Sequence, residues 1–220
     1  MKAFLKRLLR KYYFIWRSAC MVQSIPARFG KIAFHNHGSC VKIRKSIIGC
    51  DNIFIVGRDS IIQNVSLYIR GNSVRVEIGD GVIMGPGCSI RCEGDNIHVM
   101  IGKNTTMTRD IHFCAQESGS SIIVGEDCMF SNNIIVRTSD SHPIFDAEGE
   151  RINPPASVKI GDHVWIAPES TVLKGVVIGN GAIIGSKSLV TKTVEPNCLF
   201  AGIPAHIVKK SISWTREELY

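Results

Sequence analysis

An aliphatic residue recurs every six positions in the second half of the chain. These residues are Ile160, Ile166, Val172, Ile178, Ile184 and Val190. Four positions after each of them stands a small or β-branched residue, namely Val164, Ser170, Val176, Ala182, Ser188 and Val194. A period of six fits neither the 3.6-residue repeat of an α-helix nor the two-residue alternation of an ordinary strand. It is typical of a solenoid of short strands joined by tight turns, with the aliphatic side chains inside.

The earlier part of the chain carries the same pattern with a longer period. Ile78, Ile101 and Val124 each precede a glycine and stand 23 residues apart. We interpret each interval as a coil of about eighteen residues with about five more looped out at one corner. Cys88 and Cys128 fall at the small-residue corner positions of this pattern. The sequence therefore predicts that both thiols are buried.

The pattern divides the chain into three parts. Residues 1–30 precede the repeats, residues 31–195 form an all-β parallel β-helix interrupted by a loop at 137–159, and residues 196–220 form a C-terminal extension. A length of 220 residues with 45% hydrophobic side chains is enough for a substantial core. No run of 18 uncharged apolar residues occurs, so the sequence predicts no membrane-spanning helix.

The positive charge is concentrated ahead of the repeats. Residues 1–50 contain eleven of the 26 Lys and Arg and no Asp or Glu, so the remainder of this +7 chain is mildly acidic. The large apolar residues of 1–18 fall on one face of a helix, which predicts a basic amphipathic helix. It either caps the open end of the solenoid or attaches residues 1–20 to an anionic membrane surface.

These features also bear on location and on partners. A secretory signal is disfavoured because the apolar stretch at 12–16 is short and is closed by Arg17. Nucleic-acid binding is disfavoured because the basic residues accompany an apolar helical face rather than exposed stacking aromatics. The eight cysteines show no CxxC pair and no metal-ligand spacing, which favours small buried residues in a reducing cytosol. We expect a cytoplasmic protein, with peripheral membrane contact if the N-terminal helix docks.

The hexads stop after Val136 and resume at Ile160, which leaves a long irregular insertion in a regular solenoid. Such insertions are typical places for function. His142 is the only histidine in it, and Pro143 favours an extended backbone there. Asp140 stands two residues earlier, where a carboxylate can hold an imidazole nitrogen and leave the other as a base. Trp165 follows 23 residues after His142, so we expect the two to share a cleft.

Several motifs together resemble a known family. These are the unbroken hexads, Asp140-Ser141-His142-Pro143, residues 158–166, and residues 189–192 with 201–205. They resemble the hexapeptide-repeat acyltransferases, whose fold is a left-handed parallel β-helix, and among these the galactoside and maltose acetyltransferases. Residues 138–144, 149–153 and 195–198, with Trp214, are still more similar to bacterial capsular polysaccharide O-acetyltransferases acting on sialic acid polymers. The resemblance covers roughly residues 95–214.

The resemblance implies a homotrimer with active sites between subunits and acetyl-CoA as the donor. It makes His142 the general base that takes a proton from a sugar hydroxyl while that oxygen attacks the thioester. No acyl-enzyme is needed, because the thioester is already activated. Trp165 becomes a wall of the cleft, with space filling at a subunit contact as the alternative. Asn132 and Asn133 are acceptor-contact candidates, or turn residues at a solenoid corner.

The resemblance also places coenzyme A along the C-terminal coils. Ala167, Ser186, Thr191 and Lys192 follow the pantetheine arm, and His206 and Lys209 lie near the phosphates, where relatives tend to carry arginines. Pro168 has no N–H, although some relatives use an amide of that coil to hold the oxyanion. The oxyanion donor therefore stays open between the Ala167 N–H, another amide and a side chain.

A solenoid of this kind can also support functions other than acetyl transfer to a polysaccharide. A zinc hydratase on the same helix needs three converging histidines, and the seven in the chain offer no trio at coil spacing, so no metal is expected. A non-catalytic sugar-binding solenoid and an acetyltransferase for a small acceptor, such as an amino sugar, serine or an antibiotic, stay open. The sequence favours an acetyl-CoA-dependent O-acetyltransferase that modifies a bacterial surface polysaccharide, and it leaves the acceptor sugar unspecified.

Overall fold

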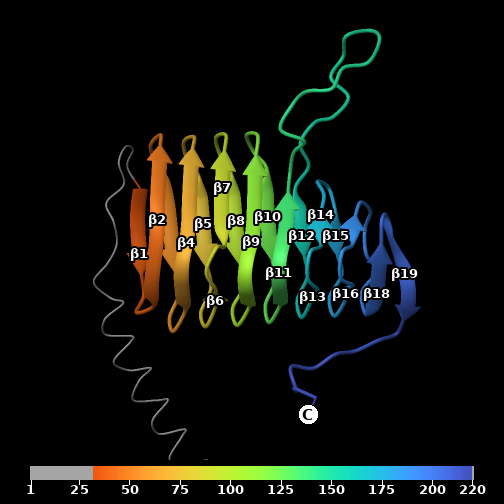
Figure 1. Ribbon diagram of the computed structural model, residues 1–220. Coiled ribbons are helices and arrows are strands. Elements are labelled where there is room, and N and C mark those ends of the chain that lie inside the picture. The colour runs from red at the N-terminus through yellow and green to blue at the C-terminus, as the bar shows by residue number, and fades with distance from the viewer. Residues whose placement is uncertain (1–31, 220) are drawn as a thin grey trace, which may run out of the picture.

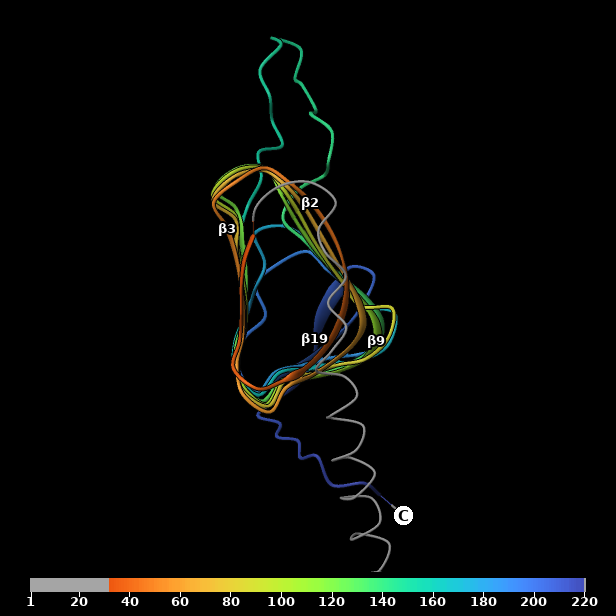
Figure 2. The ribbon, with the colours of Figure 1, turned by 90° about the vertical axis from the view of Figure 1, so that its left-hand side faces the viewer.

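The computed structural model describes residues 32–219, which form strands and turns without a helix. Successive coils stack into one parallel β-solenoid (Figure 1) and superimpose when viewed along its axis (Figure 2). This confirms the predicted all-β parallel β-helix. The N-terminal amphipathic segment lies outside the described residues, so its capping or membrane role stays a prediction. Residues 32–219 contain no helix that could cross a membrane.

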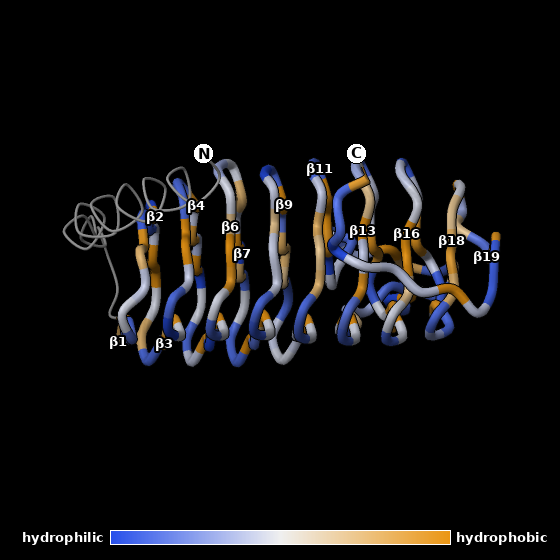
Figure 3. Tube along the Cα trace, turned by 90° about the horizontal axis from the view of Figure 1, so that it is seen from below, coloured by the Kyte–Doolittle hydropathy of each residue, from blue (hydrophilic) through white to orange (hydrophobic). Residues whose placement is uncertain are grey.

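One face of the solenoid is a seven-stranded parallel sheet. Its inward side chains align from coil to coil, as in the row Val76, Val99, Ile122 and Val158, each of which is fully buried. Apolar positions therefore lie beside one another in neighbouring coils (Figure 3). In spatial order the strands are β1 (Ile32–Asn36), β3 (Asn52–Val56), β5 (Arg75–Ile78), β8 (His98–Ile101), β10 (Ser121–Val124), β12 (Val158–Ile160) and β15 (Val177–Ile178).

The second sheet covers the other two faces by bending across a corner. Its long strands are β2 (Cys40–Ile48), β4 (Ile61–Arg70), β9 (Thr106–Gln116) and β11 (Met129–Arg137). The short ones are β6 (Ile83–Met84), β7 (Ser89–Glu93), β13 (Trp165–Ile166), β14 (Thr171–Val172), β16 (Ile183–Ile184) and β17 (Leu189–Val190). The strands turn where one residue per coil has positive φ, among them Asn64, Asp110 and Asn133. Asn and Asp tolerate this left-handed conformation better than most residues do.

The sequence suggested that the five additional residues of each early coil form a loop at one corner, but they do not. They lengthen both strands that flank one corner, so that β7 and β8 continue to a tight turn at Gly94–Ile97. Cys92 and Ile97 point inward beside Ile90 and Val99 and are almost fully buried. The longer period is therefore a wider coil with more core, because the alternation of buried and exposed residues continues along the added segment.

The cysteines follow the prediction only in part. Cys88 and Cys128 are buried at the corner positions, and burial raises the pKa of each thiol to about 11. Cys40, Cys92 and Cys198 are buried as well. The general expectation of buried thiols is wrong for Cys50, which is exposed at a turn, and holds only partly for Cys114, whose side chain lies half-buried on the outer surface of β9.

The solenoid ends in an antiparallel hairpin. Strand β18 (Cys198–Gly202) continues the second sheet beside β16, and β19 (Ala205–Lys210) folds back against β18. The chain then returns along the outside of the preceding coils (Figure 1). We call residues 211–219 the C-terminal strap.

Candidate active site

His142 lies on a loop that projects from one corner of the solenoid, between β11 and β12 (Figures 1 and 2). The two arms of the loop pair with each other, because Phe145 bridges Arg151 and the Ile152 N–H donates to the Ile144 carbonyl at 2.9 Å. The His142 side chain is exposed, and its ring makes no hydrogen bond to any of residues 32–219. The loop therefore presents an imidazole whose nitrogens are both available.

An ion pair joins the base of this loop to the preceding coil. The Arg151 guanidinium donates two hydrogen bonds to the Glu117 carboxylate, at 2.6 and 2.8 Å. The Ser139 hydroxyl donates to the same carboxylate at 2.6 Å. Hydrogen bonds from Arg151 and Ser139 hold the pKa of Glu117 below its usual value, so the carboxylate is ionised at neutral pH.

The sequence suggested that the Asp140 carboxylate holds the His142 ring, but in the structure it binds other groups. Its Oδ2 atom accepts hydrogen bonds from Lys174 Nζ at 2.6 Å and from Asn153 Nδ2 at 3.0 Å. These bonds, with that from Lys174 the stronger influence, lower the pKa of Asp140. The turn after β14 brings Lys174, 34 residues farther along the chain, to the base of the loop, where its ammonium group pairs with the Asp140 carboxylate. An orienting role for Asp140 is therefore indirect.

Four predicted site residues lie at the corner where the second sheet bends. Asn132 and Asn133 are at this corner in β11, Ala167 follows β13 and Ser186 follows β16. Backbone hydrogen bonds connect this corner in successive coils, from Glu169 N to Asn132 O and from Lys187 N to Pro168 O. Asn133 has φ 56°, which supports its alternative interpretation as a turn residue.

The Ala167 N–H is not a free oxyanion donor. It donates to the Ile184 carbonyl at 2.9 Å, as part of the ladder between adjacent coils. With Pro168 lacking an N–H, neither residue of this corner supplies a backbone donor. Of the oxyanion donors that the resemblance leaves open, another amide or a side chain remains.

Three of the residues assigned to coenzyme A line one open pocket of about 640 Å³ beside the terminal hairpin. Thr191 and Lys192 line it from the turn after β17, and His206 lines it from β19. Pro204 and Ile207 complete its apolar part. Lys209 lies farther along β19, opposite Leu199, and does not line the pocket. The pocket therefore combines three titratable side chains, Lys192, His206 and the acidic Glu195, with an apolar wall.

Trp165 does not share a cleft with His142 within one chain. It pairs with Met129, the first residue of β11, whereas the His142 loop begins after Arg137, the last. The corner at Asn133 separates them, so they lie on different sides of the coil. Trp165 instead packs beside Trp214, with ring centroids 6.0 Å apart. Its indole nitrogen is buried and has no hydrogen-bond partner among the described residues.

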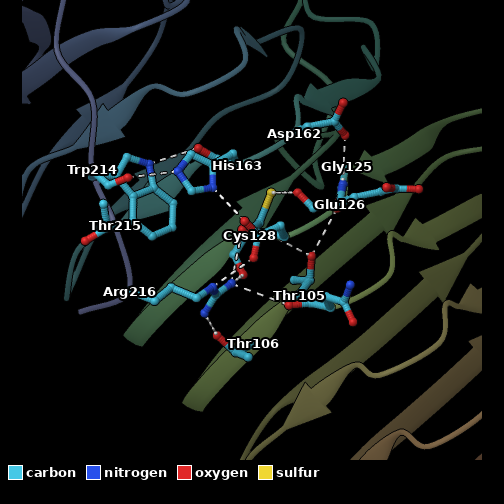
Figure 4. Close-up of polar contacts among 12 residues, drawn as sticks. Thr105, Thr106, Gly125, Glu126, Cys128, Asp162, His163, Trp214, Thr215 and Arg216 are labelled. Atoms are coloured by element: carbon cyan, nitrogen blue, oxygen red, sulfur yellow. Dashed lines mark hydrogen bonds and ion pairs between the residues drawn. The ribbon is translucent and has the colours of Figure 1, made fainter. Parts of the chain in front are cut away.

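The C-terminal strap attaches to three coils of the solenoid (Figure 4). The Trp214 ring stacks on His163 at 3.9 Å, and its Nε1–H donates to the His163 carbonyl at 2.9 Å. Arg216 donates to the Asp127 carboxylate at 2.8 Å, to the Thr106 hydroxyl at 2.9 Å and to the Cys128 carbonyl at 2.9 Å. These contacts fix the strap on the coils, with the Trp214 ring beside that of Trp165.

Strong acid is expected to loosen the strap. Partial burial would raise the pKa of Asp127, but hydrogen bonds from His163 and Arg216 outweigh it and leave this pKa below its usual value. The stabilisation is therefore fully present above the pKa of an unfolded Asp, about 3.9, and is lost as the pH falls through the lower folded value. Tryptophan fluorescence measured from pH 6 to 2 should report the release of Trp214. Asp127→Asn should loosen the strap already at pH 6, and identical titrations of both proteins would contradict this role.

Sequence reasoning missed the residues that hold the loop. Asn153 and Arg151 belong to a motif that carried the resemblance, but no role was assigned to them. Glu117 and Lys174 lie in other coils, 34 residues from Arg151 and Asp140 respectively. The only signal in the sequence was the paired charge of the loop and of the turns beside it.

Comparison with known proteins identifies relatives of this chain. Residues 157–192 match the bacterial transferase hexapeptide family (six repeats). A polysialic acid O-acetyltransferase of Neisseria meningitidis is 37% identical over 175 residues, which cover 78% of this chain and 79% of that protein. A polysialic acid O-acetyltransferase of Escherichia coli O1:K1 / APEC is 33% identical over 121 residues, but the match spans 54% of this chain and 39% of that one.

A solved structure extends the similarity to the whole fold. The polysialic acid O-acetyltransferase OatWY matches with a TM-score of 0.69 and 31% identity, over 86% of this chain and 93% of that one. The polySia-specific acetyltransferase NeuO matches with a TM-score of 0.55 and 27% identity. Each of these two matches covers 86% of this chain. The chain therefore belongs to the hexapeptide-repeat acyltransferases.

Proposed function

We propose that this protein is an acetyl-CoA-dependent O-acetyltransferase that modifies a sugar hydroxyl of a bacterial surface polysaccharide, such as a capsule or an O-antigen. The observation that carries the proposal is the exposed His142 ring, which is held on a hydrogen-bonded loop and keeps both nitrogens available. The relatives support the acceptor class, because two that match most of this chain are named as polysialic acid O-acetyltransferases.

His142 acts as the general base in direct transfer. The imidazole removes the proton of the sugar hydroxyl as the hydroxyl oxygen bonds to the thioester carbonyl carbon. The C–S bond of the tetrahedral intermediate then breaks, and the proton passes to the departing coenzyme A thiolate. The products are the acetylated sugar and free coenzyme A, so the base returns to its starting state.

The complete site lies between two copies of the chain in this proposal. Within one chain His142 is separated from Trp165 and from the pocket lined by Thr191, Lys192 and His206. The loop also exposes Ile144, Phe145 and Ile152, each more than half accessible. Water-exposed apolar side chains at a projecting tip favour contact with another surface. A homotrimer would bring the loop of one copy to the bent corner and the coenzyme pocket of the next.

Coenzyme A occupies the corner and the hairpin pocket in this arrangement. Ala167 and Ser186 are small residues at the corner, so a pantetheine arm can approach the backbone closely there. Lys192 supplies positive charge for the phosphates, His206 lines the same pocket, and Lys209 lies farther along β19. Asn132 is half-buried at the same corner and stays an acceptor-contact candidate.

Mass spectrometry of candidate acceptors tests the proposal. The protein is incubated with acetyl-CoA and, in separate reactions, an oligosialic acid, a neutral oligosaccharide, an amino sugar, serine or chloramphenicol. We expect oligosaccharides to gain acetyl groups that mild alkali removes, as it does esters and not amides. If only a small acceptor gained acetyl groups, the proposed polysaccharide acceptor would be wrong and that small-molecule class would be the substrate. Failure to acetylate any of them would favour a non-catalytic sugar-binding solenoid.

A further inference from the structure

The side-chain amide of Asn153 lies at the centre of the loop base and is only 7% accessible. Its Oδ1 accepts from the Ile144 N–H at 2.7 Å and from Arg151 Nε at 3.3 Å. Its Nδ2 donates to the His142 carbonyl at 2.9 Å and to Asp140 Oδ2 at 3.0 Å. These partners fix which way the Asn153 amide faces. A backbone N–H donor must face Oδ1, and a carbonyl acceptor must face Nδ2.

These bonds hold the backbone on both sides of His142. One amide group accepts from residue 144 and donates to residue 142, and Pro143 between them has no N–H of its own. The His142 ring has no hydrogen-bond partner within residues 32–219. Among the described contacts, the location of the imidazole is therefore set through its main chain, and Asn153 supplies that constraint.

Two ion pairs connect the amide to the solenoid. Asp140 receives Asn153 on one side and Lys174 of the following coil on the other. Arg151 donates to the Asn153 side chain and backbone carbonyl and forms two bonds with Glu117 of the preceding coil. The bonds to the coils before and after the loop restrict how far its base can shift.

We propose that Asn153 is a positioning residue for acetyl transfer, which acts by fixing the His142 main chain relative to the coils at the base of the loop. The inference rests on the proposed function of His142 as general base. A base delivers its effect only within hydrogen-bond reach of the proton that it removes, and a displacement of about 1 Å can cost about 10²-fold. Asn153 touches no reacting atom in this scheme.

Asn153→Asp tests the proposal with the smallest change in shape. The variant keeps one oxygen for the Ile144 N–H but turns the donor that faces the His142 carbonyl and the Asp140 carboxylate into an acceptor. We expect kcat to fall about 10- to 100-fold. The KM for acetyl-CoA should stay within about twofold, because Asn153 is buried in the loop base and does not line the hairpin pocket. Asn96→Asp, at an exposed turn of another coil, is the matched control and should leave both constants unchanged.

The split between kcat and KM decides the outcome. A kcat within twofold of the parent protein would overturn the positioning role, and so would a parallel rise of the acetyl-CoA KM that points to general disorder. If Asn153→Asp fails to fold, Asn153→Ala removes the same donors without adding charge and is judged by the same split. His142→Ala, measured alongside, separates the positioning role of Asn153 from the general-base role of His142. Undiminished transfer by His142→Ala would show that His142 is not the base, whatever the Asn153 result.

Discussion

His142→Ala is expected to lower kcat for acetyl transfer about 10²- to 10⁴-fold, the usual contribution of a general base. Alanine cannot accept the proton of the sugar hydroxyl, so the attacking oxygen must release it to solvent. The KM for acetyl-CoA should change little, because the imidazole acts on the proton of the acceptor hydroxyl whereas Thr191, Lys192 and His206 line the proposed coenzyme pocket. Initial rates of coenzyme A release, measured with a thiol reagent at saturating acceptor, give both constants.

The control for this experiment is a second surface histidine. His98 lies on the seven-stranded sheet, where its ring contacts Glu77 at 2.9 Å, far along the chain from the loop. His98→Ala should keep kcat within about twofold of the parent protein. Imidazole added to His142→Ala should restore part of the rate, since a free base can replace the missing one. A His142→Ala protein with the parent rate would require another base.

The repeat made the solenoid predictable because each hexad position is a packing position. The row of Val76, Val99, Ile122 and Val158 and the bent corner both follow from residues spaced by one coil. The 23-residue period was less transparent, since a count of added residues does not say whether they form a loop or longer strands. Cys92 and Ile97 provided that information through their alternation with polar neighbours, and the structure shows them inside the widened coil.

The site was predictable where its residues are local and unpredictable where they are not. An insertion that carries one histidine before a proline identified the loop. The partners of that loop depend on which coils stack beside it, and a separation of 34 residues does not reveal that Lys174 contacts Asp140. Within one chain Trp165 lies apart from His142 for a related reason: one coil plus the loop gives the distance along the chain but does not reveal the corner between two faces.

Phe130→Ala is expected to destabilise the solenoid by about 3 to 5 kcal/mol, the usual cost of removing a fully buried phenylalanine. The Phe130 ring is fully buried and packs edge-to-face with Phe113, with centroids 5.9 Å apart. Its backbone pairs with Met107 in the preceding coil and with Ile166 in the following one. A cavity at this position weakens both coil interfaces, and in a solenoid each coil is stabilised mainly by its neighbours.

Thermal unfolding is measured at one fixed protein concentration, because the proposed homotrimer would make Tm concentration-dependent. A loss of 3 to 5 kcal/mol corresponds to a fall in Tm of about 6 to 20 °C for a chain of this size. Ile48→Ala removes an aliphatic side chain that is half exposed in β2 and should cost about 0.5 kcal/mol or less. Phe130→Ala would cost no more than this control only if the coil that carries the His142 loop repacked around the missing ring. A Tm of Phe130→Ala no lower than that of Ile48→Ala would therefore contradict the prediction and show that the stacked interior is more adaptable than its burial indicates.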